Sequence, residues 1–174
     1  MLEQLRRDFV GGLTQAFREL CSELLPEHEL ALEYRPGWSD GKSLMEVLDE
    51  GLVQDRRLAH TRAGPHRAEL RVTVGSILAA GTVSRGEQKL IAAALVLAQA
   101  RTLAEHRGIR CVILVDDLPS ELDGCSRGRL LDALGRTPSQ RWFTSIEPMA
   151  VPMSDAGTFS RYTIEAGKVS SMVY

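Results

Sequence analysis

Apolar residues recur every three or four positions over the first 24 residues, a spacing that predicts one apolar face on a long α-helix. The face consists of Leu2, Leu5, Phe9, Leu13, Phe17, Leu20 and Leu24, and Pro26 ends the pattern. A second, shorter stripe spans residues 44–52, and alternating apolar and polar residues at 30–35 predict a short strand between the two helices. We therefore expect residues 1–62 to form a helical arm with a small β element.

Strand and helix patterns alternate through the rest of the chain. The predicted elements are, in order, a strand at 69–74, a helix from Ser84 to Arg107 stopped by Gly108, a strand at 111–115, a helix ending near Gly135, a strand at 141–146 and a hairpin around Gly167. The apolar run 111–115 is typical of a strand buried on both faces of a parallel sheet. The alternation favours the α/β class, with strand 111–115 central in a lobe formed by residues 63–174.

Composition and charge narrow the class of protein only slightly. The 174 residues can bury a core of their own, and the net charge of −2 gives no overall signal for binding nucleic acid. The three cysteines have no C-x-x-C spacing, which argues against a disulfide framework. Because no apolar run approaches the roughly 20 residues that span a bilayer, and no apolar signal region opens the chain, we expect a cytoplasmic protein without a membrane partner.

One short stretch is nevertheless rich in basic residues, namely Arg56, Arg57, His60, Arg62, His66, Arg67 and Arg71. A run of this kind usually forms a solvated face. The alternative is a patch that contacts the phosphates of DNA, for which Arg56, Arg57 and Arg62 are the candidates.

The predicted helix at Ser84 begins with a motif that bears on ligand binding. Ser84-x-x-Glu87 matches a capping box, in which each side chain accepts a hydrogen bond from the other residue's backbone amide. Gly86 would let a ligand approach the backbone closely, and the free amides of a helix N-terminus attract anions. The motif therefore predicts an anion-binding helix start, with an ordinary helix start as the alternative.

Two adjacent acids, Asp116 and Asp117, follow the apolar run 111–115 directly. Protein-bound Mg²⁺ is usually held by one or two carboxylates together with phosphates and water, and a second acid can orient or deprotonate an attacking water. The alternative is a pair of acids that cap the next helix. Gly41-Lys42-Ser43 resembles the end of a P-loop, but Gly37 precedes Gly41 by one position too few, so we expect no P-loop there.

In combination, these motifs resemble those of the RecF family of ABC- and SMC-type ATPases. The matching segments are Gly64-Pro65-His66-Arg67-Ala68-Glu69-Leu70, the signature-like Ser84-Arg85-Gly86-Glu87-Gln88-Lys89, the Walker B and D-loop run 115–123, and Pro36-Gly37-Trp38 in the arm. The resemblance covers roughly residues 34–168. It implies an α/β fold that is an incomplete ABC-type ATPase lobe with a helical arm, equivalent to the C-terminal half of a RecF protein and lacking the half with the P-loop.

The resemblance implies roles for particular residues. Asp116 would hold Mg²⁺, and Asp117 would be the catalytic carboxylate. The signature residues Ser84, Arg85, Gly86, Glu87 and Gln88 would contact the γ-phosphate of ATP held by the other protomer, and the D-loop residues are Ser120 and Asp123, with Asp123 at the dimer seam. Thr144-Ser145-Ile146 stands where ABC transporters have a histidine, so hydrolysis should be slow. Without a P-loop, this chain alone should be inactive.

The resemblance also implies partners and cofactors. RecF proteins form ATP-dependent homodimers, bind duplex DNA near single-strand gaps, and act with RecR and RecO to load RecA. ATP and Mg²⁺ would be the cofactors of the complete protein. Two alternatives remain open: a lobe of another SMC-like ATPase, against which the segment 64–70 argues, and a non-enzymatic α/β interaction module.

Overall fold

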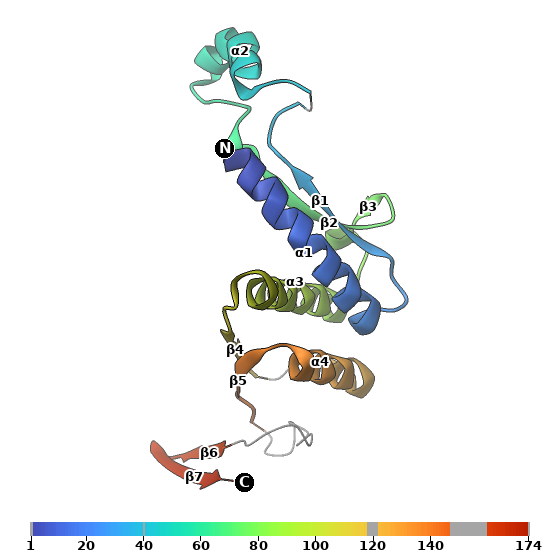
Figure 1. The fold of residues 1–174 in the computed structure, drawn as a ribbon, viewed down its shortest axis with the longest axis vertical. Helices are drawn as coiled ribbons and strands as arrows, with labels where there is room; N and C mark the ends of the chain where they lie inside the picture. Colours follow the sequence, from blue (N-terminus) through green and yellow to red (C-terminus); the bar gives the residue numbers. More distant parts are fainter. Residues whose placement is uncertain (1, 40, 118–121, 147–159, 174) are drawn as a thin grey trace.

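The computed structural model describes residues 2–39, 41–117, 122–146 and 160–173. Its helices are α1 (Leu2–Leu24), α2 (Leu44–Leu58), α3 (Arg85–Arg107) and α4 (Gly124–Arg136), with short 3₁₀ turns at Pro65–Arg67 and Ala79–Gly81. Its strands are β1 (Leu30–Arg35), β2 (Glu69–Val74), β3 (Ile77–Leu78), β4 (Cys111–Val115), β5 (Ser139–Phe143), β6 (Ser160–Glu165) and β7 (Lys168–Val173). Along the long axis of the molecule, α2 lies at one end and the β6–β7 hairpin at the other, with α1, α3 and α4 between them (Figure 1).

The strands form three small sheets rather than one large sheet. β1, β2 and β3 are antiparallel neighbours, with Leu30 opposite Val74, and β6 pairs with β7 as an antiparallel hairpin. β4 and β5 are parallel, with Cys111 opposite Ser139 and α4 as the crossover between them. The parallel pair confirms the α/β class, and the strand at 69–74 and the C-terminal hairpin are confirmed as well.

The predicted strand at 141–146 is wrong in its position. β5 begins at Ser139, two residues earlier, and ends at Phe143. Polar Ser139 and Gln140 belong to the strand because they pair with Cys111 and Val112, a pairing that their own polarity does not announce. Beyond the strand, the Thr144 amide still donates to the Val115 carbonyl at 3.0 Å, while its side chain bonds to the loop after β4.

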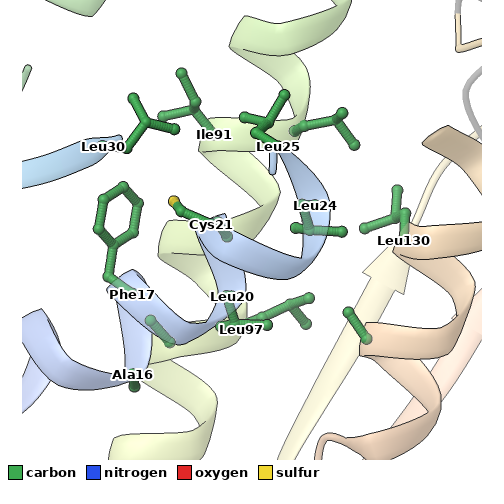
Figure 2. Packing of buried hydrophobic residues seen from close by; sticks show 14 of the residues in the cluster. Ala16, Phe17, Leu20, Cys21, Leu24, Leu25, Leu30, Ile91, Leu97 and Leu130 are labelled. Carbon is green, nitrogen blue, oxygen red and sulfur yellow. The ribbon is translucent and has the colours of Figure 1, made fainter. Parts of the chain in front are cut away.

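The hydrophobic core lies between the second half of α1, the middle of α3 and the inner face of α4. Phe17, Leu20 and Leu24 of α1 pack in one cluster with Leu97 of α3 and with Leu130 of α4 (Figure 2). α3 presents the small buried side chains of Ala94, Ala98 and Ala100 to this cluster, and small side chains let two helices approach closely. Half of α1 therefore forms part of the core together with α3 and α4.

The segment that does stand away is α2. None of its described residues is buried: Leu52 of the second apolar stripe is 46% exposed, and Leu44, Val47 and Leu48 are only partly buried. The boundary predicted between residues 62 and 63 stays a prediction, although the β1–β2 pairing joins residues from its two sides. None of the described helices has the length and apolarity that crossing a membrane requires.

β4 was expected to be buried on both faces, and among the described residues it is buried on one. Ile113 is 7% exposed and belongs to the core, whereas Val112 and Leu114 on the other face are 58% and 75% exposed. The physical reason is that, among the described residues, helices cover only the face of Ile113. Trp142 of β5 is also half exposed, and its ring stacks on that of Tyr162 with centroids 6.3 Å apart.

Candidate functional site

The start of α3 is a complete capping box. Ser84 is the N-cap, and its side-chain oxygen accepts from the Glu87 amide at 3.3 Å, while the Ser84 amide donates to Glu87 Oε2 at 2.6 Å. Arg85 and Gly86 fill the first turn, and the Gln88 side-chain amide turns back to donate to the carbonyls of Val83 and Ala80. The predicted helix start and its end at Gly108, which has the left-handed φ of 65°, are both confirmed.

A residue that the sequence analysis did not identify completes this cap. His28 lies in the turn between α1 and β1, and its Nε2 is 2.7 Å from Glu87 Oε1. The hydrogen bond from His28, followed by those from Ser84, lowers the pKa of Glu87 from its ordinary value to about 2. No sequence pattern pointed to His28, because 59 residues separate it from Glu87 and only the tertiary structure brings the two together.

A cleft of about 370 Å³ runs from the start of α3 to the start of α4. Its lining residues are Leu25, Glu27, Ser84, Gly86, Glu87, Leu90, Leu122, Asp123, Ser126 and Arg129. Asp123 is the N-cap of α4 and accepts from the Ser126 amide at 2.9 Å, a hydrogen bond that lowers the pKa of its carboxyl. The structure therefore brings the signature-like residues and Asp123 to one cleft, whereas Ser120 lies outside the described residues.

The second group of predicted site residues lies at the C-terminal end of β4. The Thr144 hydroxyl donates to Asp116 Oδ1 at 2.5 Å and accepts from the Asp117 backbone amide at 2.7 Å, so one side chain of the neighbouring strand end holds the Asp116 carboxylate and the Asp117 backbone. Asp117 has a φ of +44°, a left-handed conformation that aspartate tolerates better than most residues. Exposed carboxylate oxygens are the ligands that Mg²⁺ prefers, so these residues fit the predicted metal.

The segment Gly41-Lys42-Ser43 has a structural role of its own. Ser43 is the N-cap of α2 in a capping box with Glu46, and the Lys42 ammonium pairs with Glu50 at 2.7 Å. The strand before it, β1, belongs to an antiparallel sheet, unlike the strand that precedes a P-loop. These contacts agree with the expectation that no P-loop lies here.

The basic residues do not form one uninterrupted patch. Arg56 and Arg57 are in the last turn of α2, whereas Arg62 follows the helix and pairs with Asp55 at 2.9 Å. Arg71 lies on β2 and pairs with Glu69 at 2.6 Å. The contact of Arg56, Arg57 and Arg62 with DNA stays a prediction.

Comparison with known proteins places the chain among bacterial DNA repair proteins, although no family model matches it. The DNA replication and repair protein RecF of Chromohalobacter salexigens is 42% identical over 151 residues, which are 87% of this chain and 42% of that protein. The RecF proteins of Escherichia coli and Pseudomonas aeruginosa are 36% and 37% identical over 95% and 97% of the chain. The chain spans about half the length of these curated relatives and matches their C-terminal portion.

Solved structures show the same fold. A structure of the recombination mediator protein RecF with ATP superposes with a TM-score of 0.72 at 21% identity, over 97% of this chain and 46% of that one. An SMC head bound to the C-winged helix domain of ScpA superposes with a TM-score of 0.59 at 18% identity, over 97% of this chain and 44% of that one. The fold is thus an incomplete ABC-type ATPase lobe. Given the identity of up to 42% along most of its length, the chain belongs to the RecF family of DNA replication and repair proteins.

Proposed function

We propose that this chain is the signature-bearing part of an ATPase that acts in DNA repair. One observation carries the proposal: the capped N-terminus of α3 and the Asp123 cap of α4 line a single cleft, as a surface that receives a partner's nucleotide requires. The solved RecF structure with ATP and the names of the sequence relatives support it.

The two ends of the candidate site would serve different nucleotides. The Ser84 hydroxyl and the free amides around Gly86 would bind the terminal phosphate of ATP held by the partner protomer, because helix N-termini attract anions. Asp123 would lie at the seam between the protomers. Arg85, Glu87 and Gln88 would support the same surface from the first turn of α3.

The acids after β4 would serve the nucleotide of their own protomer. Asp116 would ligate Mg²⁺, which when bound offsets the charge of the phosphates, and Asp117 would orient or deprotonate the attacking water. Thr144 holds both residues through its hydroxyl. A neutral hydroxyl cannot accept a proton as readily as an imidazole can, so we expect slow hydrolysis.

We further infer the wider role from the family. The complete protein would dimerise on ATP in the cytoplasm, bind duplex DNA near single-strand gaps, and act with RecR and RecO in loading RecA. A contribution of Arg56, Arg57 and Arg62 to DNA binding belongs to this proposal. The RecFOR pathway named for the solved RecF structure supports the assignment to that pathway.

A hybrid protein tests the proposal, with residues 1–174 replacing the matching segment of the Chromohalobacter RecF. We expect a non-hydrolysable ATP analogue to convert the hybrid from monomer to dimer in light scattering. Ser84→Arg should abolish dimerisation and leave nucleotide binding to the monomer unchanged, because Ser84 would serve the partner's nucleotide. The matched control is Ser76→Arg in the exposed turn between β2 and β3, which should dimerise normally.

The outcomes separate the site from its alternatives. A Ser84→Arg hybrid that dimerises as well as the control would show that Ser84 is only an ordinary helix cap. An unsubstituted hybrid that binds no ATP would reject the ATPase assignment and favour a non-enzymatic interaction module.

A further inference from the structure

His28 has no role in the proposed function, and it lies where three elements of the fold meet. It lies in the turn after α1, contacts the first turn of α3 through Glu87, and is next to Glu27, whose carboxylate is 3.8 Å from Arg129 of α4. Its side chain is 23% exposed and that of Glu87 is 26% exposed, so the pair is partly shielded from solvent. Partial shielding makes a charge–charge contact stronger than it is on an open surface.

The position of Glu87 creates an electrostatic problem for an anion-binding helix start. Its carboxylate is ionised at neutral pH and is held against the Ser84 amide, at the place proposed to receive a phosphate. A bare carboxylate there would repel a phosphate and cancel part of the favourable helix dipole. A positive charge bonded to Glu87 removes this conflict without removing the cap.

We propose that His28 is a positioning residue of the signature site, which as an imidazolium holds Glu87 on the Ser84 amide and offsets the carboxylate charge where the phosphate is received. The proposal deepens the proposed function and rests on it. His28 itself need not touch the nucleotide, because it acts through Glu87 Oε1 while Glu87 Oε2 accepts from Ser84.

The other charged groups around the cleft are mostly acidic. Glu87 on α3, Glu27 in the same turn and Asp123 at the start of α4 are acids, and Arg129 on α4 is the base that faces them. Arg129 also donates to the Ser126 side chain at 3.2 Å, which ties it to the cap of α4. Three acids stand against one arginine, so a positive charge on His28 would offset part of the negative charge of the cleft.

A metal ion is the competing occupant of this cluster. One potential ligand atom from each of Glu27, His28 and Glu87 lies within 4.8 Å of the others. However, the two oxygens of Glu87 already accept from His28 and from the Ser84 amide, and Arg129 lies beside Glu27. A proton shared between His28 and Glu87 satisfies these groups, whereas a cation would have to replace that hydrogen bond with the positive Arg129 guanidinium nearby.

NMR on residues 1–174 tests the proposal without any nucleotide. The amide resonance of Ser84 should shift in a step that coincides with protonation of His28, read from the imidazole ring protons in the same titration. His28→Gln keeps a donor to Glu87, so Ser84 should keep its slow amide exchange but lose the pH step. His28→Ala should lose the step and exchange the Ser84 amide about tenfold faster, because a hydrogen bond to a charged group is lost.

The control is His60→Gln, since His60 bonds to the Leu58 carbonyl and not to Glu87. This substitution should leave the pH-dependent shift of the Ser84 amide resonance unchanged. A Ser84 amide that ignores the protonation of His28, or a step that survives in His28→Gln, would overturn the proposal. So would stoichiometric Zn²⁺ binding that shifts the His28 ring and frees the Ser84 amide.

This measurement is read separately from the dimerisation of the hybrid protein. If the Ser84 amide resonance does not shift when His28 is protonated, the role of His28 is rejected and the ATPase assignment stays in place. A hybrid that fails to bind ATP rejects the assignment, whatever the Ser84 amide shows.

Discussion

Phe17 offers a direct test of how α1 supports α3, the helix that begins with the signature-like residues. Its side chain is 0% exposed and belongs to the cluster that α1 forms with α3 and α4. Phe17→Ala removes a fully buried ring and leaves a cavity, a change that costs about 3–5 kcal/mol in such positions. Domains of this size are stable by only about 5–15 kcal/mol, so the loss is a large part of the total. The melting temperature should fall by roughly 6–20 °C.

The matched control is Phe9→Ala on the same helix, about two turns earlier. Phe9 is 47% exposed, so its truncation removes much less buried area and should cost about 1 kcal/mol. Urea unfolding followed by circular dichroism measures both variants, and an unchanged m-value shows that the unfolding transition is the same. Equal losses of unfolding free energy in the two variants would refute the packing of α1 on α3, and with it the reasoning that α1 anchors α3.

Two further predictions concern titratable groups. Because the folded state lowers the Glu87 pKa to about 2, its contribution to stability is complete above its ordinary value of 4.5 and is lost as the pH falls toward 2. Glu87→Gln should therefore flatten the pH dependence of the unfolding free energy between about pH 2 and 4.5, whereas the exposed-site control Glu165→Gln should keep the slope of the wild type. A Glu87→Gln slope as steep as that of the wild type would contradict the prediction. Burial raises the pKa of Cys21 to about 12, so iodoacetamide should label exposed Cys125 but not Cys21 in the native protein; mass spectrometry showing equal rates would contradict this.

Several features of the fold follow from short stretches of sequence. The capping box of Ser84 and Glu87 was predictable because its two hydrogen bonds join residues three positions apart. The end of α3 at Gly108 was predictable because glycine adopts the left-handed conformation without strain. The strand Cys111–Val115 and the acids after it were predictable from a continuous apolar run that stops at Asp116.

Other features depend on which surfaces meet, and these the sequence alone did not determine. The amphipathic stripe of α1 requires a partner but does not say that α3 provides it, or that no residue of the α2 stripe becomes fully buried. An apolar strand looks the same whether one face or both are covered, so the exposure of Leu114 was not foreseen.

The candidate site shows the same division. Its motifs are local and could be identified from the order of residues, because capping and strand termination act over a few positions. The pairing of His28 with Glu87 spans 59 residues and exists only because the core sets the turn after α1 against the first turn of α3. Sequence therefore determined which groups the helix start carries, and the tertiary structure decided which charge is placed beside them, since long-range electrostatic contacts depend on packing rather than on spacing along the chain.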